Sequence, residues 1–202
     1  KKGSKEMEVN NRTKKVTRCG MLIGIAIILQ YIEISIPIMP SFIKLDFSDL
    51  PELIGALAYG PLTGVLIALI KNIIHMAVSQ SGFVGELSNF LLGATFAAVA
   101  GYVFQKNPTK SGVFKASALG ALAMALISWP INYWIIYPLY YSVLGFPEVA
   151  ILEMYQLLMP SIKSIGQALL VFNVPFTLIK GIINGVIMVL IYNRIQFIFH
   201  EK

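Results

Sequence analysis

Four polar side chains on the last apolar segment are the residues best placed to do chemistry. They lie within "VFNVPFTLIKGIINGVIMVLIY", residues 171–192, and are Asn173, Thr177, Lys180 and Asn184. On a helix with 100° per residue, this spacing gathers them within an arc of about 40°. A charge at the bilayer centre costs roughly 2.5–3.5 kcal/mol on insertion scales, so the stripe should face a wet or ligand-filled cavity. The alternative is that Lys180 joins helices or pairs with a carboxylate, although no carboxylate is expected nearby and Glu33 is the nearest.

Further buried amides are expected near the outer ends of other segments. Asn89 lies one turn into its apolar segment, and Asn132 follows Trp129 and Pro130. Each amide alone is as well explained by hydrogen bonds between helices. Their common placement in the outer half predicts a substrate site that opens outward.

The sequence lacks the patterns that would indicate an enzyme. It contains no HExxH, no GxSxG and no phosphate-binding loop. "KNIIH" supplies His75 without a second metal ligand at a suitable spacing, and Cys19 is the single cysteine. We therefore expect no metal, no cofactor and no ATPase site of the chain's own.

The composition indicates a membrane protein rather than a nucleic-acid binder. Of 202 residues, 56% are hydrophobic and 13% are charged. Several apolar stretches approach or exceed the roughly 18 residues that indicate a bilayer span. The cations gather before the first span, in the connection around Lys106–Lys115 and after the last span, as the positive-inside bias predicts. The charge of +6 is therefore better explained by a bilayer than by DNA or RNA.

We predict an all-α, multi-pass fold with six transmembrane helices and both termini in the cytoplasm. Residues 1–14 should be a basic, disordered tail, and residues 15–202 a single transmembrane domain. "YGP" at 59–61 interrupts residues 51–79, and placing the Lys106–Lys115 connection inside requires two helices there. Pro147 to Leu158, in the long outer connection, could form a short interfacial helix. The expected spans are residues 17–36, 50–60, 62–79, 87–105, 113–138 and 166–193.

Small residues on the first span indicate a docking face for another membrane protein. "RCGMLIGIAII" places Gly20 and Gly24 four positions apart, which permits close approach of a second helix. Because such spacing is common by chance, the two glycines can be explained either by a docking face or by chance.

Three longer stretches resemble a known family. They are "LDFSDLPELIGALAYGPLTGVLIALIKNIIH", "ELSNFLLGATFA" and "FNVPFTLIKGIINGV". Together with the basic N-terminus, they resemble the substrate-binding S components of energy-coupling factor (ECF) vitamin transporters, most closely the riboflavin-specific members. The resemblance implies a six-helix plasma-membrane protein with one vitamin site facing outward. It also implies a transmembrane coupling protein and two cytoplasmic ATPases as partners. Gly20 and Gly24 stand where the family usually has alanines.

The polar residues suit a flavin. The imide edge of an isoalloxazine alternates acceptors with a donor, which Asn amides and a Lys ammonium can match. The segment 37–47 could cover the pocket as a gate, with Met39, Leu45, Asp46 and Phe47 as candidate contacts. The alternatives are an S component for another vitamin, such as thiamine or biotin, and a stand-alone carrier. The absence of an evident inverted repeat disfavours the carrier.

Overall fold

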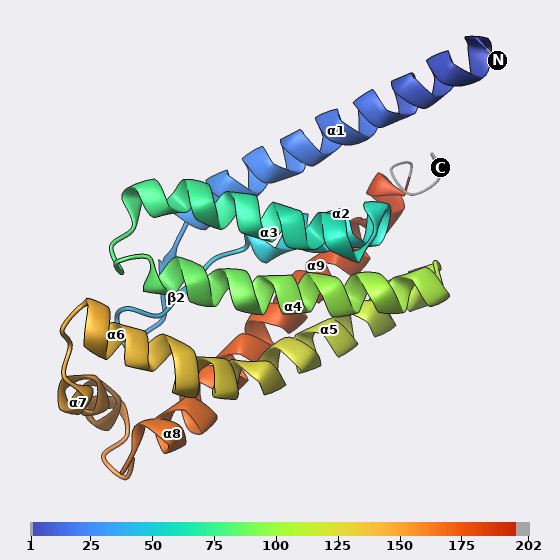
Figure 1. Cartoon of the computed structure of the whole chain (residues 1–202). Coiled ribbons are helices and arrows are strands. Elements are labelled where there is room, and N and C mark those ends of the chain that lie inside the picture. Colours follow the sequence, from blue (N-terminus) through green and yellow to red (C-terminus); the bar gives the residue numbers. More distant parts are fainter. Residues whose placement is uncertain (1, 197–202) are drawn as a thin grey trace.

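A computed structural model describes residues 2–196, and helices dominate it (Figure 1). This confirms the predicted helical class. The elements in chain order are α1 (Lys2–Tyr31), the short strands β1 (Ile34–Ser35) and β2 (Lys44–Leu45), α2 (Asp49–Tyr59), α3 (Pro61–His75), the 3₁₀ turn η1 (Met76–Val78), α4 (Val84–Lys106), α5 (Lys110–Ile131), the π turn η2 (Asn132–Ile136), α6 (Tyr137–Val143), α7 (Glu148–Leu158), α8 (Ile165–Ala168), the π turn η3 (Leu169–Asn173) and α9 (Val174–Ile195).

Within the described part of the chain, four helical runs are long and apolar enough to cross a membrane. They are Pro61–Val78, Val84–Lys106, Lys110–Val143 and Ile165–Ile195, and they overlap the four longer spans expected between residues 62 and 193. Helix α2 has 11 residues, or about 16 Å of helix, which is shorter than a bilayer core.

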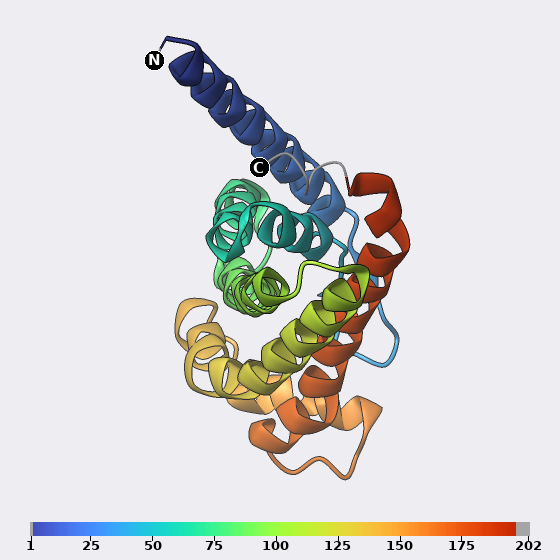
Figure 2. The same ribbon diagram turned by 90° about the vertical axis from the view of Figure 1, so that its right-hand side faces the viewer.

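Helix α1 differs from the prediction at both ends. It ends at Tyr31, five residues before the expected limit, and Ile34 and Ser35 then pair with Leu45 and Lys44. This pairing requires extended backbone at Ile34 and Ser35, and Pro37 disfavours helical geometry in the residue before it. At the other end, the structure shows helix across residues 2–14, where we expected a disordered tail, and α1 extends beyond the bundle (Figure 2). Lysine, glutamate and methionine are good helix formers, which favours this extension.

Residues 49–75 form two helices rather than one kinked helix, as the charge argument predicted. The break is at Gly60, whose φ of 99° favours glycine. The helices then return against each other so closely that a Cβ on Gly64 would lie 2.6 Å from the Ala56 Cβ. We call this antiparallel pair the α2–α3 hairpin.

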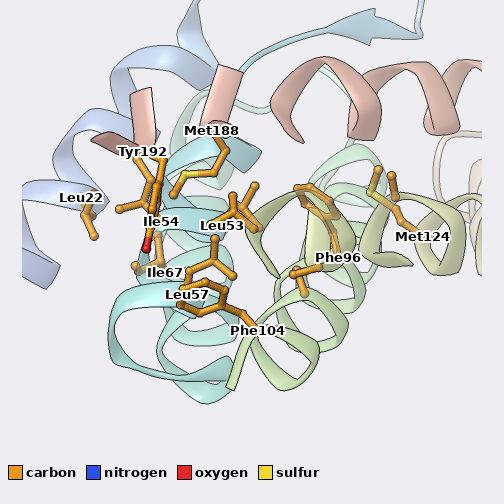
Figure 3. Close-up of a cluster of buried hydrophobic side chains, with 14 of the residues drawn as sticks. Leu22, Leu53, Ile54, Leu57, Ile67, Phe96, Phe104, Met124, Met188 and Tyr192 are labelled. Carbon is orange, nitrogen blue, oxygen red and sulfur yellow. The ribbon is translucent and has the colours of Figure 1, made fainter. Parts of the chain in front are cut away.

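The bundle has two distinct ends. The start of α1, the α4–α5 connection and the end of α9 lie at one end, and α6, α7 and α8 lie at the other (Figure 1). A hydrophobic cluster around Leu53, Phe96 and Met188 packs α1 to α5 against α9 (Figure 3). A second cluster, around Ile136 and Tyr155, packs the end formed by α6 to α8.

Candidate ligand-binding site

A cavity of about 490 Å³ brings together six of the residues that the sequence singled out. This volume lies within the usual range for small-molecule sites. Residues from α4, η2, η3, α9 and the β1–β2 segment contribute to its wall. The six are Asp46, Asn89, Asn132, Asn173, Thr177 and Lys180.

Lys180 is the charged centre of this wall. Its Nζ lies 3.0 Å from Asp46 Oδ2, 3.2 Å from Asp49 Oδ2 and 3.3 Å from Asn89 Oδ1. The expectation that no carboxylate lies near Lys180 was therefore wrong. Lys180 is only 8% exposed, yet it borders the cavity. It therefore pairs with carboxylates and faces the cavity at the same time. The close approach of α5 that buries it depends on Gly181, where a Cβ would lie 2.7 Å from the Ala121 Cβ.

A second buried lysine, which the site prediction omitted, extends the charged network away from the cavity. Lys71 Nζ lies 2.6 Å from Glu52 Oε1 and 3.4 Å from Asp49 Oδ1, and it also donates to Ser48 Oγ. Asp49 thus contacts Lys71 through one oxygen and Lys180 through the other. The sequence did carry a signal, because "DFSDLPE" spaces Asp46, Asp49 and Glu52 three apart at the start of a helix. Such a row of buried acids requires nearby cations.

Asp46 anchors the segment between β2 and α2. Its Oδ1 accepts from the backbone N of Ser48 at 2.8 Å and from the Ser48 hydroxyl, while Oδ2 accepts from Lys180. Burial acts to raise the pKa of the Asp46 carboxyl, but Lys180, Lys71 and the Ser48 hydrogen bonds outweigh it and hold this pKa below its usual range. The carboxylate is therefore ionised at neutral pH.

Two of the cavity amides lie on π turns that precede prolines. Asn132 is the first residue of η2, which ends at Ile136, two residues before Pro138. Asn173 is the last residue of η3, two residues before Pro175. Proline has no N–H for the carbonyl four residues earlier, and a widened turn relieves the lost helical hydrogen bond. Asn132 Nδ2 donates to the Ser128 carbonyl at 2.7 Å. Asn132 and Asn173 therefore both lie at the cavity wall on turns whose geometry departs from that of a regular α-helix.

Four of the predicted site residues do not belong to the cavity wall. Asn184 donates to the Lys180 carbonyl at 2.9 Å and is fully buried within the bundle. Of the gate candidates, Met39, Leu45 and Phe47 are absent from the described lining, which instead includes Phe42, Ile43 and Lys44. Successive side chains on a strand point to opposite sides, which explains why Lys44 lines the cavity and Leu45 does not.

The cavity wall also contains a histidine and a carboxylate that the site prediction omitted. His75 Nδ1 lies 2.9 Å from Glu86 Oε1, and Glu86 Oε2 accepts from the hydroxyls of Ser79 and Ser81. Tyr31 packs on the His75 ring at a centroid distance of 5.3 Å. The imidazole and carboxylate thus already have partners within the protein.

The arrangement suits binding rather than bond breaking. Its functional groups are amides, an ammonium and carboxylates, which can accept from and donate to a neutral heterocycle. Among residues 2–196, no group of three His, Cys, Asp or Glu side chains is placed to hold a metal ion.

The predicted docking glycines lie on an open part of α1. Gly20 is exposed and Gly24 is partly exposed, and an added Cβ on either would meet nothing within 4 Å. This face is therefore accessible within the described chain.

Comparison with known proteins gives a consistent family. Residues 14–192 match the family described as "ECF transporter, substrate-specific component". The chain is 31% identical over 188 residues to the riboflavin transporter FmnP of Bacillus subtilis, covering 92% of this chain and 93% of the relative. It is 27% identical over 184 residues to the riboflavin transporter RibU of Staphylococcus aureus, covering 91% of each.

A solved structure is similar in fold as well as in sequence. It is described as "Structure and mechanism of the S component of a bacterial ECF transporter", and it matches with a TM-score of 0.73 and 26% identity. The match covers 94% of this chain and 99% of the other.

Proposed function

The chain belongs to the family of substrate-specific components of ECF transporters, and from this premise we propose that it is the riboflavin-binding membrane subunit of such a transporter. The names of its relatives in Bacillus subtilis and Staphylococcus aureus support riboflavin as the ligand. Family membership also means that the chain is a transport subunit, and we assign it no enzymatic activity.

The observation that carries this proposal is the chemistry of the cavity wall. Three asparagine amides, from Asn89, Asn132 and Asn173, share the wall with the Lys180 ammonium. A flavin imide edge needs both donors and acceptors, and each amide supplies both. Riboflavin has no phosphate, and the two lysines of the wall, Lys44 and Lys180, are already paired with acids. Aromatic and aliphatic side chains such as Phe42, Phe176 and Leu92 suit the flat ring.

Segment 37–47 is the proposed gate of this site. Asp46 lies within it and pairs with Lys180 on α9, so one ion pair fastens the segment across the cavity. Opening the segment exposes the cavity but separates this pair. We assign Met39, Leu45 and Phe47 to the body of the gate, because the cavity wall is formed by its neighbours Phe42, Ile43 and Lys44.

We place the site on the extracellular side of a six-helix plasma-membrane protein. The start of α1, the end of α9 and the α4–α5 connection with its flanking lysines, Lys106 and Lys110, gather at one end of the bundle, which suits a cytoplasmic location under the positive-inside bias. The cavity borders Ile136, Tyr137 and Tyr140 of the opposite end. The six proposed crossings are α1, α2, α3 with η1, α4, α5 with η2 and α6, and α8 with η3 and α9.

The proposed partners are a transmembrane coupling protein and two cytoplasmic ATPases. Gly20 and Gly24 provide an open small-residue face on α1 where a coupling helix could approach closely. The double substitution Gly20→Leu and Gly24→Leu should leave riboflavin binding by the isolated subunit unchanged and abolish ATP-dependent uptake by the assembled transporter. Uptake at the wild-type level would remove these glycines from the docking face.

The test of the function is ligand binding by the purified chain. Protein purified from riboflavin-replete cells should carry a flavin absorption spectrum, and protein stripped of it should quench riboflavin fluorescence on titration. Thiamine and biotin, titrated in parallel, should give no competing signal. Displacement by either vitamin, or a colourless protein that does not bind added riboflavin, would overturn the assignment. Uptake into liposomes without ATPase partners would instead indicate a stand-alone carrier.

A further inference from the structure

A buried tyrosine outside the cavity lies beside one of the proposed ligand-binding amides. Tyr155 belongs to α7 in the outer connection, is completely buried and is absent from the described cavity lining. Its hydroxyl donates to Asn173 Oδ1 at 2.6 Å. Asn173 lies at the cavity wall, so a residue from α7 contacts the site through it.

Three side chains close a ring of hydrogen bonds around this contact. Tyr155 donates to Asn173, Asn173 Nδ2 donates to Tyr137 Oη at 3.3 Å, and Tyr137 donates to Tyr155. The 2.6 Å contact suits an O–H···O bond and the 3.3 Å contact suits an N–H donor, which fixes the orientation of the amide. Each member donates once and accepts once within the ring. The second hydrogen on Asn173 Nδ2 is then left for a group in the cavity.

We propose that Tyr155 is a positioning residue for ligand binding, because its hydroxyl holds the Asn173 amide so that a donor is presented to a carbonyl or ring nitrogen of the bound flavin. The inference rests on the proposed riboflavin-binding function. It gives α7 a task in the site although α7 contributes nothing to the described cavity wall. Burial raises the pKa of the Tyr155 hydroxyl, which keeps it a donor at physiological pH.

The local structure explains why Asn173 needs this support. It is the last residue of the π turn η3, where regular helical geometry does not dictate the direction of the side chain. Tyr155 also packs its ring against Phe172 at a centroid distance of 5.4 Å, so it contacts two neighbouring residues of the same turn. The ring contact could serve stability alone, whereas the hydroxyl acts on the amide.

The variant Tyr155→Phe separates these two roles, because it keeps the ring and removes the hydroxyl. Its Kd for riboflavin should rise about tenfold, within the usual effect of one hydrogen bond. Tyr141→Phe, a tyrosine in α6 outside the ring, is the matched control and should bind riboflavin like wild type. The unfolding temperature of the ligand-free variants, measured in detergent, reports any effect on the fold.

A double-mutant cycle tests whether Tyr155 acts through Asn173. In an Asn173→Ala background, Tyr155→Phe should change the Kd less than twofold, because the amide to be positioned is gone. An unchanged Kd for the single variant Tyr155→Phe would overturn the inference, as would an equal loss in both backgrounds. Wild-type protein that binds no riboflavin would overturn the proposed function itself, a result that the wild-type titration reveals before any variant is compared.

Discussion

The two buried lysines of this protein have similar surroundings and different tasks. Lys71 is fully buried, and its oxygen partners are Asp49 and Glu52 in the α2–α3 hairpin and Ser48 directly before it. Lys180 has partners from the gate segment, α2 and α4, and it borders the cavity. One lysine therefore neutralises acids within a closed part of the fold. The other joins separate elements around a space that a ligand can enter.

This difference determines what each charge costs and contributes. A buried ion pair gains little over an apolar pair, but removing one partner leaves an uncompensated charge. For Lys71 that uncompensated charge would lie among fully buried side chains. For Lys180 it would border the cavity, where water can reach Asp46. We therefore expect the same substitution to affect stability at one lysine and ligand affinity at the other.

The largest effect is expected from Lys71→Met. The change leaves Glu52 buried without its cation, while Asp49 keeps Lys180, and this should cost roughly 3–5 kcal/mol of folding free energy. The measurement is the unfolding temperature in detergent together with the folded fraction on size-exclusion chromatography. Lys115→Met, an exposed lysine on α5, is the control and should behave like wild type. A stable Lys71→Met protein would contradict the role assigned to Lys71.

A smaller effect on stability and a large effect on binding are expected from Lys180→Met. Loss of a charged hydrogen-bond donor should weaken riboflavin binding by roughly 1.5–3 kcal/mol. Fluorescence titration measures the change in Kd. Lys44→Met alters another lysine of the cavity wall, one that is partly exposed and paired with Glu33, and it should lower affinity much less. An equal loss of riboflavin affinity in both variants would contradict a specific role of Lys180 in binding.

Asp46→Asn should affect the gate more than the site. The neutral amide keeps an acceptor for Lys180 but loses the charge, so segment 37–47 should open more readily. We expect riboflavin to dissociate several-fold faster, with a smaller change in the association rate. Stopped-flow fluorescence measures both rates. An unchanged dissociation rate would remove the Asp46–Lys180 pair from gating.

The smallest effect is expected from pH. Because the pKa of Asp46 is lower in the folded protein, its stabilising contribution is complete above the ordinary aspartate value of about 3.9 and is lost only as pH falls through the lowered value. Riboflavin affinity should therefore stay constant between pH 8 and pH 5. A tenfold loss across this interval would assign control of binding to another titrating group.

The sequence predicted the face of α9 better than its depth. Helical periodicity predicted that Asn173, Thr177 and Lys180 share one face, and all three line the cavity. Asn184 shares that face, but it lies a further turn along the helix and bonds to the backbone of Lys180. Periodicity gives direction around a helix and not the distance along it at which a cavity ends.

Contacts between distant segments were beyond the reach of local patterns. Asp46 and Lys180 are 134 residues apart, and only the folded bundle brings them together. Tyr155 carried no signal at all, because a tyrosine in an apolar outer connection is more simply explained by packing. The row of acids from Asp46 to Glu52 was the exception. Its three-residue spacing places the acids on one face, and burial of that face in an apolar segment would need cations such as Lys71.

The most direct test of the role assigned to Lys180 is the unfolding temperature of wild type and of Lys180→Met, each measured with and without riboflavin. At a ligand concentration of 100 times the wild-type Kd, binding should stabilise wild type by about 2.7 kcal/mol and raise its unfolding temperature by several degrees. Lys180→Met should unfold within a few degrees of ligand-free wild type, and riboflavin at the same concentration should stabilise it by at most about half as much as wild type. A full rise in Lys180→Met would contradict the assignment of Lys180 to the ligand site.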